Sequence, residues 1–183
     1  VAEVVDVEAA AACGLALGGT VLAIHTGSRG LGHQVCDDAL RTMLRASQEY
    51  GIELPDRQLC CAPLGSPEAE AYLAAMAAAA NFAFANRQVV ASLALRAVER
   101  RARALGLAFE SRVLYDVAHN IAKWELHGEG RERRRLLVHR KGATRALPAG
   151  HPDLPPAYRG VGPPVLSPGD MGRASGVLAG EPG

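Results

Sequence analysis

The longest predicted element of the chain lies in residues 66–106, which read SPEAEAYLAAMAAAANFAFANRQVVASLALRAVERRARALG. The first three residues place a serine at the N-cap, a proline at the first helical position and an acid in the first turn. The pattern therefore predicts one helix that runs to about Leu105 and ends at Gly106. Its many alanines indicate close packing against another element, as in a helix that supports a scaffold.

Shorter patterns surround this helix. A second helix is predicted from about Gly32 to Tyr50, because apolar residues recur there at helical spacing and Gly51 follows. The other predicted elements are a helix over Glu8–Leu17, strands over Thr20–Ile24, Phe109–Leu114 and Leu136–His139, a helix over Ile121–Leu126, and a strand near Val165–Leu166. Strands and helices alternate without a regular βαβ rhythm, so we expect an α+β fold with a mixed sheet and packed helices.

Composition places the chain among soluble globular proteins. It has 183 residues, 49% hydrophobic and 21% charged, which suits one domain with a real core and excludes a disordered chain. No apolar run is long enough to span a bilayer, and no signal peptide is expected. The four cysteines lack paired zinc spacing, so buried free thiols in a reducing cytoplasm are predicted. The net charge of +1 does not exclude basic clusters on part of the surface, because a nearly neutral total can combine acidic and basic regions.

The first candidate for a functional site is His25-Thr-Gly-Ser-Arg29-Gly-Leu-Gly32, which follows the predicted strand Thr20–Ile24. Its glycines free the backbone, and Arg29 adds a planar, bidentate donor inside the turn. His119 likewise follows a strand-like run. Neutral imidazoles suit manganese, zinc or iron, which makes a shared metal site one interpretation. A hydrogen-bonded core histidine is the alternative that spacing alone leaves open.

The same turn, extended to Cys36 as HTGSRGLGHQVC, resembles the metal-and-phosphate loop of the RtcB family of RNA-splicing ligases. Five later stretches resemble that family in the same order: residues 56–63, 76–88, 115–123, 137–146 and 158–175. Members of the family are much longer than this chain. Residues 1–183 therefore resemble an internal to C-terminal segment, a partial catalytic domain without the upstream metal-ligand region and the downstream nucleophilic histidine.

The resemblance implies roles for individual residues. His25 and His119 match two ligands of a two-manganese centre, whose aspartate, cysteine and further histidine lie upstream in the family. Arg29 and Lys141 match cations that contact phosphate, with Arg145 and Arg159 as weaker candidates of the same kind.

A nucleotide site is also implied. Asn120 matches a guanylate contact made by the family's His-Asn pair. The family's guanine-nucleotide loop is matched by Pro168, Gly169, Asp170, Met171 and Ser175. Asp170 and Arg173 depart from the usual serine and threonine, so a carboxylate lies where it would either pair with guanine or repel phosphate.

The function implied is a segment of a GTP- and manganese-dependent RNA ligase. Such enzymes join a 3′-phosphate or 2′,3′-cyclic phosphate end to a 5′-hydroxyl end, as in tRNA splicing and RNA repair. RNA, GTP or GMP, and an archease-type activating protein are the implied partners, in the cytoplasm and without a membrane. Without the nucleophilic histidine, the isolated chain is expected to be inactive.

Three other hypotheses remain open. The chain is alternatively a catalytically dead module that binds RNA or nucleotide, a metal-dependent phosphoesterase, or an unstable fragment. Two acids, Asp116 and Asp56, are read as structural: a helix cap for the first, and a salt bridge to Arg57 or Arg87 for the second. The arginines at 100, 101 and 103 are read as a solvated helix face.

Overall fold

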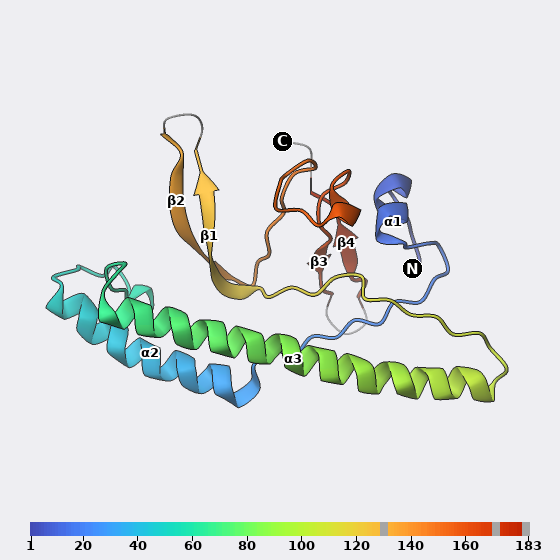
Figure 1. Ribbon diagram of the computed structural model, residues 1–183, viewed down its shortest axis with the longest axis horizontal. Coiled ribbons are helices and arrows are strands. Elements are labelled where there is room, and N and C mark those ends of the chain that lie inside the picture. The colour runs from blue at the N-terminus through green and yellow to red at the C-terminus, as the bar shows by residue number, and fades with distance from the viewer. Residues whose placement is uncertain (129–131, 170–172, 181–183) are drawn as a thin grey trace. The chain divides into compact units, whose positions relative to one another are not determined.

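The computed structural model describes residues 1–128, 132–169 and 173–180, which divide into two compact units (Figure 1). One unit is Ile24–Ser111, and the other combines Val1–Ala23 with Arg112–Gly183. The first is helical and the second carries two small antiparallel sheets. This confirms an α+β fold. The mixed sheet is wrong for the described residues, because both of their strand pairs run antiparallel.

The helical unit is built on α2 (Arg29–Glu49) and α3 (Pro67–Ala104), joined through the short helix η1 (Arg57–Leu59). Helix α3 begins as predicted, since Ser66 Oγ accepts a hydrogen bond of 3.2 Å from the N–H of Ala69. It also ends as predicted, just before Gly106. Figure 1 shows α2 lying along the first part of α3, which then continues past it.

Small side chains let the two helices approach closely. The buried residues of α2 are Met43, Ala46 and Ser47, and those of α3 are all alanines: Ala69, Ala79 and Ala83. Ser47 Oγ accepts a hydrogen bond of 3.0 Å from the N–H of Cys61, which ties the connection between the helices to α2. The predicted packing of α3 against another element is thus confirmed, although only three of its alanines are buried.

The other unit begins with α1 (Val7–Cys13), which is capped at both ends. Asp6 Oδ1 accepts from the N–H of Ala9 at 2.9 Å, and Gly14 closes the helix with a φ of 63°. The guanidinium of Arg112 donates to the carbonyl of Cys13 at 2.8 Å. Glycine suits the left-handed backbone at position 14, and a Cβ there would also displace the Arg112 guanidinium, whose Nη2 would lie 1.2 Å away.

The two sheets of this unit are hairpins. Strand β1 (Asn120–His127) pairs with β2 (Arg134–Lys141), and β3 (Val165–Ser167) pairs with β4 (Gly176–Leu178). Between them lies the short helix η3 (Pro156–Tyr158), whose Tyr158 hydroxyl donates to the carbonyl of Leu114 at 2.5 Å. The strands predicted over Leu136–His139 and near Val165–Leu166 are confirmed.

Several predictions of secondary structure are wrong. Ile121–Leu126 forms strand β1 rather than a helix, because it pairs along its whole length with β2. Asp116 therefore cannot cap a helix there. Thr20–Ile24 and Phe109–Leu114 form no strand and pair with none in the parts of the chain that the structure describes.

The cysteines and acids also differ in part from expectation. All four thiols are free, as predicted, but only Cys13 is buried, and burial raises its pKa. Asp56 is a cap: its Oδ1 accepts from the N–H of Gln58 at 2.8 Å at the start of η1. The arginines near the end of α3 are exposed, and Arg103 pairs with Glu99 across one helical turn. None of the described helices is long and apolar enough to span a membrane.

Candidate phosphate and nucleotide site

The glycine turn of the helical unit is held by two consecutive residues of α3. Asn86 Nδ2 donates to Thr26 Oγ1 at 3.2 Å and to the carbonyl of Gly27 at 2.9 Å. Arg87 Nη1 donates to the carbonyl of Thr26 at 3.2 Å, and its guanidinium lies 4.5 Å from the centre of the Phe84 ring. The backbone beside His25 is therefore fixed by side chains about sixty positions away. The sequence predicts no role for Asn86 and indicates Arg87 only as an alternative salt-bridge partner of Asp56, although both lie in a stretch that resembles the family.

Arg29 is held in an uncommon conformation at the start of α2. Its φ is 53°, the only positive value among the non-glycine residues that the structure describes. Its Nη1 donates to Thr26 Oγ1 at 3.4 Å, while the residue as a whole is exposed. A Cβ at Gly32 would lie 1.9 Å from Ser28 Oγ, so a larger residue there would displace the Ser28 side chain. Backbone strain of this kind gathers at ligand-binding sites, which favours a functional role for Arg29.

Replacing Asn86 with alanine should destabilise the chain by about 1–2 kcal/mol, because two half-buried acceptors of the turn would lose their donor. The midpoint of urea unfolding, followed by circular dichroism, measures this loss. Gln88→Ala is the matched control, since Gln88 is an exposed amide on the same helix. Equal effects of the two changes would show that Asn86 does not hold the turn.

The other unit brings three predicted site residues together at the open end of the β1–β2 hairpin. Asn120 and Lys141 are partners in the strand register, and His119 directly precedes Asn120. Asn120 Oδ1 accepts from the N–H of Gly142 at 2.9 Å, and the N–H of Ala143 donates to the carbonyl of His119 at 3.3 Å. These bonds close the hairpin end, and the exposed Lys141 lies beside them. An ammonium group and an amide thus lie where an anion has access to both.

An ion-pair network links the two strands of this hairpin. The Glu125 carboxylate accepts from Arg140 Nη1 at 2.5 Å and from Nη2 at 2.9 Å. Arg145 Nε lies 3.9 Å from the same carboxylate, and its Nη1 lies 3.4 Å from Asp153. The hydrogen bonds from Arg140 lower the pKa of Glu125 to about 2. Burial, followed by the charges of Arg145 and Arg140, lowers the pKa of Lys123. The charge of Arg145 is already compensated, which weakens it as a phosphate contact.

The predicted nucleotide loop joins β3 to β4. The N–H of Gly169 donates to Ser175 Oγ at 3.0 Å, so two of the predicted residues contact each other. A Cβ on Gly169 would lie 2.3 Å from the carbonyl oxygen of Ala174, which only glycine avoids. Pro168, Gly169 and Ser175 are exposed. Asp170 and Met171 lie outside the described residues.

The predicted metal ligands belong to different units. His25 is an exposed residue of the helical unit, and His119 is a half-buried residue of the other. Among residues 1–128, 132–169 and 173–180, no group of three or more histidine, cysteine, aspartate or glutamate side chains is placed to hold a metal ion. A metal shared by the two histidines therefore stays a prediction.

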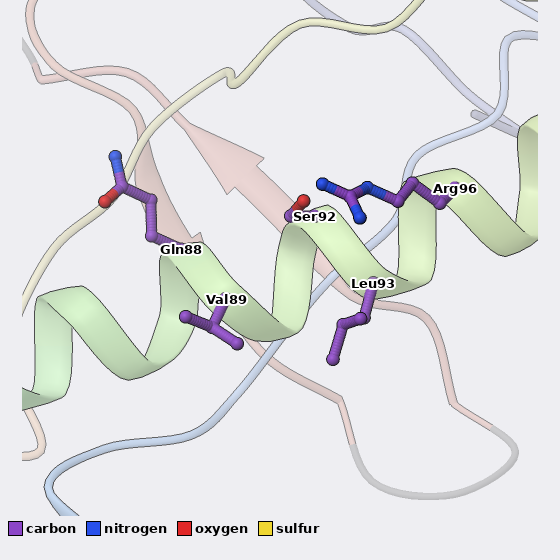
Figure 2. A pocket seen from close by; sticks show the side chains of 5 residues that line it. All are labelled: Gln88, Val89, Ser92, Leu93 and Arg96. Atoms are coloured by element: carbon purple, nitrogen blue, oxygen red, sulfur yellow. The ribbon is translucent and has the colours of Figure 1, made fainter.

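A shallow depression of about 350 Å³ lies on α3, and no predicted site residue is among the residues that line it. Figure 2 shows Gln88, Ser92 and Arg96 along one line of the helix, with Val89 and Leu93 along the neighbouring line. All five come from one helix face at spacings of one to four residues, so the depression is a surface feature of α3.

The family model for the tRNA-splicing ligase RtcB matches residues 1–183. The tRNA-splicing ligase RtcB of Thermococcus kodakarensis is 52% identical over 181 residues, which are 99% of this chain and 38% of that protein. The RNA-splicing ligase RtcB of Mycobacterium bovis is 53% identical over 181 residues, 99% of this chain and 41% of that protein.

A third relative, the tRNA-splicing ligase RtcB of Aeropyrum pernix, is 50% identical over 182 residues. With full coverage by the family model and about half of all positions identical, the class is that of the RNA-splicing ligases. The chain belongs to the RtcB family. It spans 38–41% of the length of these three relatives.

Proposed function

We propose that this chain is part of a GTP- and manganese-dependent RNA ligase that acts in the cytoplasm. The enzyme would join 3′-phosphate or 2′,3′-cyclic phosphate ends to 5′-hydroxyl ends, with an archease-type protein as an activator. The observation that carries the proposal is the family match along the whole chain. The grouping of His119, Asn120 and Lys141 at one hairpin end supports it, because this places an amide and a cation beside a metal-ligating residue type.

The metal would be held only in part by this chain. We assign His25 and His119 as two ligands of a manganese centre, with the remaining ligands from other parts of the longer family protein. The described residues hold no group of three donors, so the proposal requires further ligands from outside them. When bound, the metal would reduce the repulsion between phosphate groups and orient the reacting oxygens.

The other residues would act by binding and orientation. Arg29 and Lys141 would neutralise charge on the attacked phosphate, which is the largest electrostatic need of phosphoryl transfer. Asn120 and the loop with Pro168, Gly169, Asp170, Met171 and Ser175 would contact guanylate. The hydrogen bond between Gly169 and Ser175 supports a shared role for these two residues, because it holds them together.

The test is covalent labelling with radioactive GTP and manganese. The isolated chain should form no guanylylated adduct. A chimera in which it replaces the matching 181 residues of the Thermococcus kodakarensis relative should form one. An adduct on the isolated chain would overturn the proposed division of the site, and a folded chimera without an adduct would overturn the ligase proposal.

A nucleic-acid-binding module without catalysis is the second candidate. The exposed cations Arg29 and Lys141 favour it, because they can hold RNA phosphates without a metal. It predicts RNA binding that weakens with salt and needs no manganese, combined with a chimera that never ligates.

A further inference from the structure

The register of the β1–β2 hairpin gives it two faces of different character. Side chains alternate along each strand, so Lys123 and Glu125 share one face with Arg140. On that face the charges of Glu125 and Arg140 compensate each other, and both side chains are largely buried. The opposite face is here called the Trp124 face. It carries the polar residues Asn120, Arg135, His139 and Lys141 together with Ala122, Trp124, Leu126 and Leu137, of which Ala122 is buried.

The Trp124 face combines an accessible aromatic ring with uncompensated positive charge. Trp124 is 44% exposed, and the guanidinium carbon of Arg135 lies 4.5 Å from the centre of its ring. Arg135 and Lys141 are exposed, and no carboxylate of the described residues lies within ion-pair distance of either one. Lys141 lies four residues along β2 from the register partner of Trp124, or about 13 Å. The ring and the ammonium group would therefore contact different nucleotides of one strand.

We propose that the Trp124 face binds single-stranded RNA, with one base stacked on the ring of Trp124 and phosphates held by Arg135 and Lys141. The inference rests on the proposed function, because it names where the ligase would hold RNA beside the reacting ends. Stacking on an aromatic ring tolerates any base, and arginine strengthens such sites through cation–π contact. The charge of this face matches a polyanion, which favours RNA over a neutral or basic protein surface.

Trp124 is the only tryptophan of the chain, so its fluorescence reports directly on stacking. We would titrate the chain with a fluorescein-labelled uridine dodecamer for anisotropy, and with the unlabelled dodecamer for tryptophan emission, in the absence of GTP and manganese. The expected result is quenching that saturates at the RNA concentration where anisotropy also saturates. RNA binding with unchanged emission would overturn the inference. Protection of the free chain's emission from iodide would also overturn it, because a protein segment would then cover the ring.

Substitutions separate stacking from charge. Trp124→Ala should weaken RNA binding roughly 5- to 150-fold, and Trp124→Phe should retain most of the affinity because it keeps a ring. Arg135→Gln should lower the slope of log affinity against log salt by about 1. The matched control is Arg134→Gln, since Arg134 is exposed on the same strand but lies on the opposite face. If Trp124→Ala does not fold, the inference is tested with Trp124→Phe, Arg135→Gln and Arg134→Gln instead.

The inference and the ligase proposal fail in different measurements. If Arg135→Gln and Arg134→Gln changed the slope of log affinity against log salt equally, the inference would be overturned. The ligase proposal would be unaffected, because guanylylation of the chimera does not depend on that slope. A chimera without guanylylation would overturn the ligase proposal, while quenching of Trp124 by the dodecamer would still report a base on the ring.

Discussion

Lys141→Ala should slow RNA ligation by the chimera on the order of 10²- to 10³-fold, the cost of removing one group that stabilises charge at a reacting centre. Lys141 lies at the hairpin end beside its register partner Asn120 and is exposed there. Its ammonium group has no carboxylate of the described residues within ion-pair distance, so its charge remains available to phosphate. The measurement is the single-turnover rate of joining tRNA halves with saturating GTP and manganese.

The control for Lys141 is Arg134→Ala in the same chimera. Arg134 is exposed at the far end of strand β2, so this variant should ligate within about twofold of the unsubstituted chimera. Lys141→Arg should recover part of the rate, because it restores the charge but not the geometry of the ammonium group. Ligation by Lys141→Ala at the rate of the Arg134 variant would exclude Lys141 from the phosphate site.

Glu125→Ala should destabilise the chain by about 3 kcal/mol, because it leaves the largely buried Arg140 without its bidentate partner. Glu99→Ala is the matched control. It breaks a pair with Arg103 that is short but mostly exposed, and such pairs contribute at most about 1 kcal/mol. Urea unfolding measures both values. A loss from Glu125→Ala no larger than that from Glu99→Ala would show that the network does not fix the hairpin.

The lowered pKa of Glu125 predicts that the free energy of unfolding of the chain depends on pH. Because the folded chain holds the pKa of Glu125 at about 2, below its ordinary value of 4.5, this stabilisation is complete above that ordinary value. It is lost as pH falls from about 4.5 toward 2. The free energy of unfolding of the chain should therefore decline over this range more steeply than that of the Glu125→Gln variant, which cannot titrate.

The helices of the helical unit could be predicted from the sequence, because the residues that start and end each helix lie close to its ends in the chain. Ser66, Pro67 and the glycine at 106 set both ends of α3, and alanines mark its packed face. Strand β1 could not be predicted from local sequence, because the short run Ile121–Leu126 suits a helix or a strand equally well. Its pairing with β2, and the ion pair between Glu125 and Arg140, decide between them, and both are non-local.

The candidate site residues likewise differ in how far they could be predicted from the sequence. Resemblance selected His119, Asn120 and Lys141 individually, and the hairpin register explains why they occur together. Asn86 and Arg87 were missed as supports of the glycine turn, because no local pattern links a residue in the middle of a helix to a turn far upstream. The Trp124 face was missed because it depends on β1 being a strand.

Ligation of tRNA halves by the chimera tests the central claim most directly, since it asks whether these residues perform the ligase's chemistry in a complete protein. We predict GTP- and manganese-dependent joining of the 3′-phosphate end to the 5′-hydroxyl end, abolished by His25→Ala or His119→Ala. A second chimera carrying Asp170→Ser and Arg173→Thr isolates the two departures from the family loop. Soluble, cooperatively folding chimeras of both kinds that join no ends, beside an active Thermococcus kodakarensis relative, would contradict the assignment.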